Sequence, residues 1–255
     1  MIKIDTKRIE FSPQDVNRGL KLPSRVTAEL AEETGIHIGD GHMSINRRSN
    51  FMEHRYEISF GDRDKVYMNN YVIPLMQRLY GVRPRIYQYP KEGYSQVRYS
   101  YKGLVQFKHF TIGLPAGNKA KIITIPKIIL NSSFVTRCIR GVAETDGSLS
   151  FKRRYKDVHY YPYIKIEMIS KRLIQQIELI LRSQKIKFST LYDYHIENTR
   201  GFGDAEHHMI FVSGKKNILE WEKKIGFSNP RNIARLNVWK EMGFIPKDML
   251  FNRNV

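Results

Sequence analysis

Cysteine, acidic residues and long apolar runs are all scarce in this chain of 255 residues. Its single cysteine, Cys138, excludes an internal disulfide framework and a zinc site built on cysteines. No apolar run reaches the roughly 18 residues that a membrane-spanning helix needs, and the N-terminal M-I-K-I-D-T-K-R lacks the apolar segment of a signal peptide. The sequence therefore predicts an intracellular protein, cytoplasmic or organellar, with no membrane segment.

The shortage of acid leaves a large positive charge. Lys and Arg number 43 against 25 Asp and Glu, which gives a net charge of +18, while 13 Phe and 15 Tyr indicate a folded chain. A charge this large disfavours a compact chain unless an anionic partner compensates it. Basic residues recur along most of the chain, so nucleic acid is the leading partner. An anionic membrane surface is disfavoured because no basic amphipathic helix is long enough.

The stretch Ile139–Gly147, I-R-G-V-A-E-T-D-G, places an unusual carboxylate at a helix end. Apolar residues at helical spacing precede it, and Gly147 is a helix stop signal. Asp146 is therefore predicted at a helix C-terminus, where the helix dipole disfavours an anion by about 0.3–1 kcal/mol. A turn aspartate could tolerate that penalty, so one copy of the pattern is weak evidence.

A second copy strengthens the pattern. Glu33–Gly41 reads E-T-G-I-H-I-G-D-G and again has Gly, four residues, then Asp-Gly. Ahead of Asp40, small residues recur four apart on one helix face, and Gly141 and Thr145 occupy matching places before Asp146. Small residues at this spacing let two helix backbones approach closely. We therefore expect the two aspartates side by side at the end of a helix–helix contact.

The same order of elements follows each copy, as expected of a duplicated α/β unit. The first half is predicted as a helix from about Arg25 to Gly39 capped by Ser24 or Thr27, a strand from His54 to Phe60, a helix Lys65–Tyr80 that Pro74 kinks or divides, and strands Arg83–Tyr89 and Ser95–Tyr101. The second half is predicted as strands Ser148–Lys152 and Tyr160–Met168, a helix Lys171–Gln184, and strands Phe188–Ile196 and His207–Val212. The exits also correspond, Ile112–Lys119 with Ile225–Asn232. We expect an N-terminal extension over residues 1–24 and repeated subdomains over 25–126 and 127–255.

The two nine-residue motifs, with I-R-G-V-A-E-T-D-G-S and the G-L-P-A-G-N-K run ahead of it, resemble the LAGLIDADG family of homing endonucleases over about residues 25–245. Glu33 stands where that family has Leu, Ile38 where it has Asp, and the bulky Thr145 where it has Ala or Gly. The resemblance implies an α/β (α+β) fold of two pseudo-symmetric αββαββα units. They would pack through their motif helices, and two antiparallel four-stranded sheets would form a DNA-binding saddle. Two motifs in one chain imply a monomer.

The activity that the resemblance implies is site-specific cleavage of both DNA strands within a long, asymmetric target, leaving 3′ overhangs. Carboxylates converging at two helix C-termini would repel each other unless divalent cations lay between them, and hard oxygen ligands suit Mg²⁺, for which Mn²⁺ can substitute. Asp40 and Asp146 are the predicted metal ligands, and the carbonyls of Gly39 and Thr145 could share the coordination. Metals there would activate water and stabilise the leaving oxygen.

Further polar residues are candidates for supporting roles. Asp62 and Ser170, at corresponding strand-to-helix junctions, are candidates for organising catalytic water. Lys119 is a candidate transition-state cation, with Asn232 at its counterpart and Arg231 adjacent. For all five, a structural role as a cap or surface residue is an equally open interpretation.

DNA contacts are expected on the predicted strands and their turns, where basic residues alternate with Tyr and Gln. The candidates are Arg55, Arg83, Arg85, Arg98, Lys102, Lys152, Arg154 and Lys165. Arg pairs with guanine edges and Gln with adenine, while other basic groups meet phosphates. The sequence does not assign these roles to individual residues.

Two other functions fit the same scaffold. One is an RNA maturase that assists intron splicing, alone or combined with an endonuclease encoded in a mobile intron. The other is a non-catalytic DNA-binding regulator. The presence of both aspartates favours the endonuclease over a purely degenerate protein.

Overall fold

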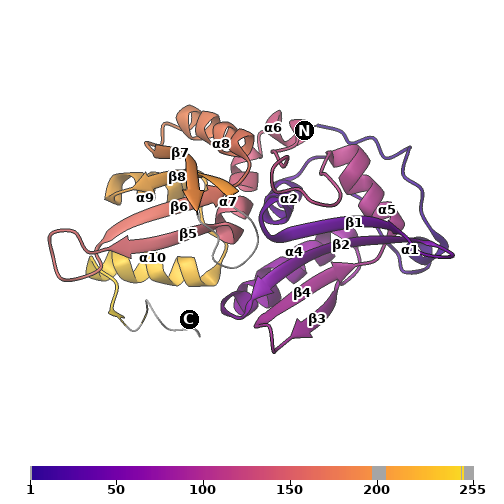
Figure 1. Ribbon diagram of the computed structural model, residues 1–255, viewed down its shortest axis with the longest axis horizontal. Helices are drawn as coiled ribbons and strands as arrows, with labels where there is room; N and C mark the ends of the chain where they lie inside the picture. Colours follow the sequence, from indigo (N-terminus) through magenta and orange to yellow (C-terminus); the bar gives the residue numbers. More distant parts are fainter. Residues whose placement is uncertain (1, 197–204, 248, 250–255) are drawn as a thin grey trace. The chain divides into compact units, whose positions relative to one another are not determined.

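Two compact units make up the chain in a computed structural model that describes residues 2–196, 205–247 and 249 (Figure 1). Unit 1 comprises Met1–Lys119 with Ile125–Gly141, and unit 2 comprises Ala120–Thr124 with Val142–Val255. Each unit is built on a four-stranded antiparallel sheet. None of the helices in the described ranges combines the length and apolar character that crossing a membrane requires.

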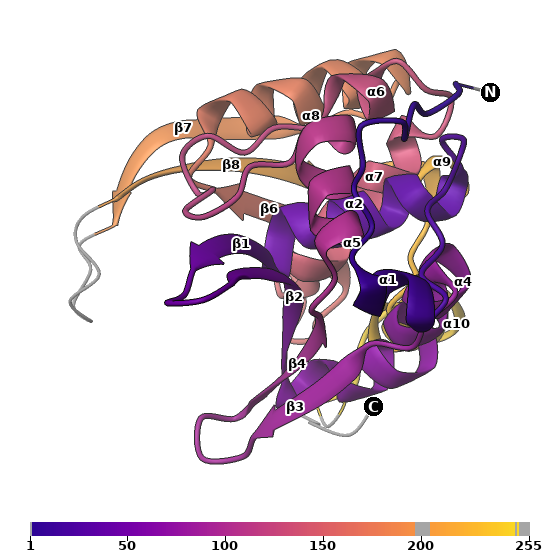
Figure 2. The same cartoon turned by 90° about the vertical axis from the view of Figure 1, so that its right-hand side faces the viewer.

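Unit 1 has the strand order β1-β2-β4-β3. Its elements are α1 (Pro13–Asn17), α2 (Ala28–Asp40), β1 (Gly41–Arg47), β2 (Met52–Gly61), η1 (Asp62–Asp64), α3 (Lys65–Tyr67), η2 (Met68–Val72), α4 (Ile73–Tyr80), β3 (Arg85–Tyr89), β4 (Tyr94–Tyr99), α5 (Lys102–Gln106), η3 (Phe107–Ile112) and α6 (Lys127–Leu130). In Figure 2, β1 and β2 lie to one side of α4 and α5. Tyr56, Ile58 and Phe60 of β2 are buried, and the alternate residues of the strand point to the other face.

Unit 2 repeats this topology with the order β5-β6-β8-β7. Its elements are α7 (Val135–Thr145), which begins in unit 1, then β5 (Gly147–Lys152), β6 (Tyr161–Met168), α8 (Lys171–Ser183), β7 (Ser189–Ile196), β8 (Ala205–Ser213), α9 (Lys215–Lys224) and α10 (Pro230–Met242). Gly41 pairs with Ile58 in the first sheet and Gly147 with Ile166 in the second. Both sheets therefore start at the glycine of a motif. A strand after Gly147 was predicted, whereas β1 after Gly41 was not.

The motif glycines are required by space and not by an unusual backbone angle. Gly41 follows α2 with an extended φ of −82°, so the chain runs directly from helix into strand. A Cβ on Gly41 would lie 2.2 Å from Nδ1 of His37, and one on Gly147 would lie 2.4 Å from the carbonyl oxygen of Ala143. Any side chain at either position would collide with the preceding helical turn.

Most predicted elements are confirmed, and the differences have local causes. Thr27 caps α2, its hydroxyl accepting from the N–H of Leu30 at 3.1 Å. Pro74 does not divide its helix, because the π-helical turn η2 ends directly before α4 and supplies the local adjustment that proline needs. The strand predicted to run to Tyr101 is shorter than expected. Strand β4 ends at Tyr99, and Lys102 begins α5.

Arg83 lies just outside its expected strand, since β3 begins at Arg85. The segment expected as an N-terminal extension packs on unit 1. Asp15 is fully buried and accepts from the N–H of Gly103 at 2.9 Å, while Ile4 and Leu20 enter the core. These early residues therefore belong to the folded body of unit 1.

Candidate active site

The helices α2 and α7 touch backbone to backbone at two glycines, as predicted from the small-residue spacing. A Cβ on Gly35 would lie 2.0 Å from the carbonyl oxygen of Cys138, and one on Gly141 would lie 2.2 Å from that of Glu32. All four residues belong to unit 1. No side chain larger than hydrogen fits at either glycine without moving a helix.

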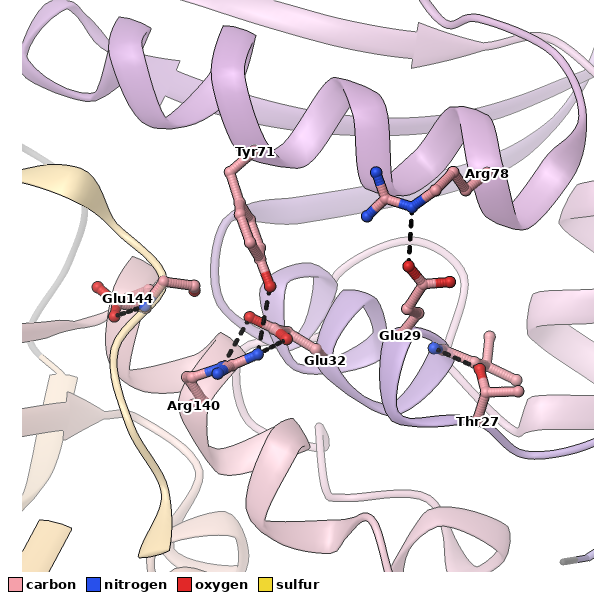
Figure 3. Close-up of polar contacts among 9 residues, drawn as sticks. Thr27, Glu29, Glu32, Tyr71, Arg78, Arg140 and Glu144 are labelled. Atoms are coloured by element: carbon pink, nitrogen blue, oxygen red, sulfur yellow. Dashed lines mark hydrogen bonds and ion pairs between the residues drawn. The ribbon is translucent and has the colours of Figure 1, made fainter. Parts of the chain in front are cut away.

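An ion pair that the sequence reasoning missed joins the same two helices (Figure 3). Arg140 of α7 binds the carboxylate of Glu32 of α2 through two nitrogens, with Nε donating to Oε1 at 2.9 Å. The Tyr71 hydroxyl accepts from the same guanidinium at 3.2 Å. Burial, followed by the charge of Glu32, raises the pKa of Tyr71 to about 12, so its hydroxyl stays neutral. The pair fixes which turns of α2 and α7 face each other.

Glu33, the departure from the family pattern at the first motif position, points into the core of unit 1. Its carboxylate pairs with Lys108 and accepts from the hydroxyl of Tyr56, and the side chains of Glu33 and Lys108 are both fully buried. Burial lowers the pKa of Lys108, and Glu33 opposes that shift. The acid is thus a structural ion pair in place of the apolar residue that the family motif has.

Asp40 is exposed at the end of α2, where Lys119 holds the last helical turn. The Lys119 ammonium donates to the carbonyl of His37 at 2.6 Å, to that of Ile38, and to that of Gly39 at 2.5 Å. An ammonium has three N–H donors, so the three carbonyls match its donors in number. The geometry therefore favours a structural role for Lys119: it caps the end of α2 and so positions Asp40. This role is favoured in preference to that of a cation that donates to the substrate.

The C-terminal turn of α7 is held differently. The carboxylate of Glu144 accepts from the N–H of Ser228 at 2.7 Å and from the side-chain amide of Asn232 at 2.6 Å. Asn232 is the predicted counterpart of Lys119. Asp146 follows as a half-buried residue whose own N–H donates to the carbonyl of Val142 at 3.0 Å. The hydroxyl of Thr145 donates to the same carbonyl at 3.1 Å.

The two candidates for organising water have other partners. Ser170 is buried, caps α8 by accepting from the N–H of Leu173, and donates to the carbonyl of Ile123 at 2.7 Å. Asp62 is half exposed and pairs with Lys65 at 2.9 Å. These contacts favour the structural interpretation of both residues.

Several of the basic residues predicted to contact DNA are already paired with acids. Arg55 pairs with Glu53, Arg98 with Glu57, Lys102 with Glu10 and Lys165 with Glu167. Lys152 and Arg154 lie over tyrosine rings, 4.3 Å from the centroid of Tyr163 and 3.9 Å from that of Tyr161. Arg83 and Arg85 are exposed. The predicted set therefore divides into residues that contact an acid or a tyrosine ring and residues that are exposed.

A separate cluster on β7 and β8 resembles a metal site in composition. Ligand atoms of Asp193, Glu206 and His208 lie within 4.8 Å of one another. However, the Lys171 ammonium sits 2.8 Å from the Asp193 carboxylate, which places a cation there already. His208 also accepts from the N–H of Asp193 through Nδ1. The cluster is therefore a local ion-pair network.

Comparison with known proteins agrees with the architecture. No protein-family model matches the chain. The glutamine–fructose-6-phosphate aminotransferase of Methanocaldococcus jannaschii is 24% identical over 223 residues, which span 85% of this chain but 18% of that protein. The chain therefore covers a small part of this curated relative.

Solved structures give the clearer likeness. A variant of I-DmoI, in complex with its nicked target DNA in the presence of manganese, aligns with a TM-score of 0.52 and 15% identity, covering 78% of this chain and 96% of its own. The LAGLIDADG meganuclease I-CpaMI bound to uncleaved DNA aligns with a TM-score of 0.51 and 14% identity, covering 86% of this chain and 91% of its own. The predicted fold class, with two antiparallel four-stranded sheets, is confirmed.

Proposed function

We propose that this chain, which has the fold of the LAGLIDADG homing endonucleases, is a site-specific endonuclease that cuts both strands of DNA and leaves 3′ overhangs. One observation carries the proposal. Each unit ends a motif helix at an Asp-Gly pair, and the glycine begins the first strand of a four-stranded sheet. An aspartate at a helix C-terminus opposes the helix dipole, and finding this twice in one chain calls for a cation.

The residues present fit a divalent metal. Asp40 and Asp146 offer carboxylates, and Gly39 and Thr145 offer carbonyl oxygens, all hard ligands of the kind Mg²⁺ or Mn²⁺ prefers. The carbonyl of Gly39 accepts from Lys119, but a carbonyl oxygen has two lone pairs and can serve both. Bound metal would supply the activation of water and the stabilisation of the leaving oxygen.

The protein residues contribute to the reaction by positioning the two aspartates and by providing positive charge that binds the DNA. Lys119 and Glu144 hold the helical turns from which the two aspartates project, and the basic sheet residues bind the DNA. We propose that each aspartate acts mainly on one strand. Asp62 and Ser170 remain candidates for ordering water, but their structural contacts are the role that we favour.

The proposal extends to the chain as a biological unit. We propose residues 25–126 and 127–255 as the two copies of an ancestral duplication, preceded by residues 1–24. The active form would be a monomer encoded in a mobile intron, in the cytoplasm or an organelle, with a long asymmetric DNA site as its substrate. Intron RNA would be a second partner.

The test uses a library of random DNA duplexes incubated with the protein and Mg²⁺, followed by sequencing of the cut ends. We expect cuts at one recurring sequence with 3′ overhangs, and none without the metal. Asp40→Asn and Asp146→Asn should each keep DNA binding and lose cleavage by at least about a hundredfold, as expected for a loss of several kcal/mol of transition-state stabilisation.

Glu222→Gln is the matched control, because Glu222 lies on α9, outside both motifs in the sequence, and pairs with Lys240. It removes one negative charge and should leave cleavage unchanged. Full activity in both aspartate variants would refute the proposed mechanism. Binding of intron RNA that persists under saturating target DNA would support the additional partner.

A further inference from the structure

A connected polar network lies on the face of the first sheet that the buried side chains of β2 do not occupy. Arg98 of β4 donates through Nε to Glu57 of β2 at 2.7 Å and through Nη2 to the amide oxygen of Gln96 at 2.8 Å. Gln96 in turn donates to the hydroxyl of Ser59 at 3.1 Å. The guanidinium carbon of Arg98 lies 4.3 Å from the ring centroid of Tyr87. Two hydrogen bonds and a stacked ring fix the plane of this guanidinium.

The network holds Arg98 without exhausting it. The side chains of Arg98 and Glu57 are only 15% and 10% exposed, so Arg98 is held against the sheet and does not extend freely into solvent. Arginine has five N–H donors in a planar fork; Glu57 and Gln96 each take one, and Tyr89 is a third partner. Donors therefore remain for a ligand. Because the side chain is already ordered, binding does not incur the loss of rotamer entropy that a mobile arginine would incur.

The second sheet shows that the fold does not need this network. Glu57 and Arg98 are register partners, and the corresponding partners in unit 2 are Lys165 and Phe211. The position of Gln96, opposite Ser59, corresponds to Met209, opposite Glu167. The sheet has the same strand order with apolar residues at two of these places. Something other than sheet pairing must account for the polar network in unit 1.

Glu57 itself argues for a ligand. A carboxylate on a DNA-binding face repels phosphates and weakens binding at long range. Such a residue is useful there when it orients a base-reading side chain, since phosphate contacts position the protein while base contacts specify the sequence.

We propose that Arg98 reads one guanine in the half of the target that unit 1 binds, with Glu57 and Gln96 as the residues that position it. This inference rests on the proposed function. Guanine presents O6 and N7 as adjacent acceptors in the major groove, which match the paired donors of a fixed guanidinium. Arg85 provides the contrast. It faces Arg98 in the neighbouring strand, is exposed, and forms no ion pair in the part of the chain that the structure describes. It contributes charge to phosphate binding.

The test is selection of bound sequences from a random duplex library in EDTA, comparing the wild type with Arg98→Lys, Glu57→Gln and Arg85→Ala. The wild type should select a motif containing a guanine that both Arg98→Lys and Glu57→Gln lose, with the preference falling about tenfold. Glu57→Gln adds net positive charge, so its general DNA affinity should rise while this preference falls. Arg85→Ala should keep the motif and reduce the salt dependence of binding by about one unit of slope.

The outcomes separate the two proposals. If the wild type selects no motif at all, site-specific recognition itself fails. If it selects a motif that Arg98→Lys and Glu57→Gln preserve at every position, the reading role of Arg98 is refuted while the proposed function stands. Circular dichroism of each variant confirms that the fold is retained, and both substitutions keep the length of the side chain closely enough for the sheet to form.

Discussion

The two motif helices reach the same Asp-Gly end but are held by groups of opposite charge. The ammonium of Lys119 binds three carbonyls at the end of α2. At the end of α7, the carboxylate of Glu144 binds N–H donors of the corresponding segment, from Ser228 and Asn232. A helix C-terminus offers free carbonyls, so the first arrangement caps the helix directly and the second ties the loop to a helical side chain. The shared requirement is a rigid last turn.

The two motifs also differ at their first and fifth positions. Glu33 and His37 of the first motif correspond by repeat spacing to Ile139 and Ala143 of the second, and all four are buried. The first motif thus carries ionisable groups at these two positions, where the second motif is apolar. Duplicated units can therefore keep one chemical end point while their supporting contacts diverge.

The largest expected effect comes from making the first motif resemble the second at its first position only. Glu33→Leu leaves Lys108 as a buried cation without a partner and should lower the free energy of unfolding by about 3–5 kcal/mol in urea titrations. Adding Lys108→Met and Tyr56→Phe removes the orphaned polar groups and should restore stability to the wild-type level or above. Ile139→Leu is the control at the matching position and should cost less than about 1.5 kcal/mol. A stable Glu33→Leu protein would contradict the role given to the pair.

Removing the cationic cap should have the next largest effect. Lys119→Met keeps much of the side-chain length but loses charge-assisted hydrogen bonds to three carbonyls, so we expect a stability loss of about 1.5–3 kcal/mol. Cleavage should fall with it because the turn bearing Asp40 loosens. Loss of cleavage with unchanged stability would instead assign Lys119 to the transition state.

The anionic arrangement should be less sensitive. Glu144→Gln keeps an acceptor oxygen for Ser228 or Asn232 and loses the charge, so the free energy of unfolding should fall by about 1–2 kcal/mol. Glu144→Ala leaves both donors unpaired and should cost more. Equal stability of wild type, Gln and Ala would show that this contact does not hold the loop.

The smallest expected effect is a pH dependence of the free energy of unfolding that comes from His37 in unit 1. His37 is fully buried and stacks on Tyr56 with ring centroids 4.5 Å apart, and neither of its ring nitrogens has a hydrogen-bond partner among the residues that the structure describes. Burial, then the charges of Lys119 and Lys108, lowers the pKa of His37 well below 6.5. The unfolded chain takes up this proton below about pH 6.5 while the folded chain does not. The His37 contribution to the free energy of unfolding should therefore fall as the pH drops below that value, by up to about 1.4 kcal/mol per pH unit.

His37→Phe provides the measurement, because it keeps a ring against Tyr56 and cannot be protonated. The difference in unfolding free energy between this variant and the wild type should grow as the pH is lowered from 6.5 and stay constant above it. A difference independent of pH would show that His37 becomes protonated in the folded protein.

Local patterns were sufficient for the elements that local physics determines. Alternation located most of the strands but not β1, Thr27 was one of two predicted caps for α2, and the spacing of small residues located the contacts of Gly35 and Gly141. The end of β4 was predicted two residues too late because the alternation of Gln96, Arg98 and Ser100 continues past Tyr99, where the strand ends.

The supporting contacts were missed for a different reason. Arg140 and Glu32 are 108 positions apart in sequence, Asn232 and Glu144 are 88 apart, and Lys108 and Glu33 are 75 apart. Periodicity reports which face of an element is buried but not which residue meets it. The sequence shows Glu33 only as an exception to the motif. Its partner, Lys108, lies on η3, the π-helical continuation of α5, and pairs with Glu33 of α2 in the fold.

The division of α7 between the two units bears on any attempt to use half of this molecule. By contacts, Ile125–Gly141 belongs with unit 1, although the repeat places it in the second copy. A fragment ending near residue 126 would lack the helix that covers Gly35 and the arginine that neutralises the buried Glu32. For the same reason, a chimera made by exchanging the second copy would need to keep residues 125–141 of this chain, with the junction placed inside α7.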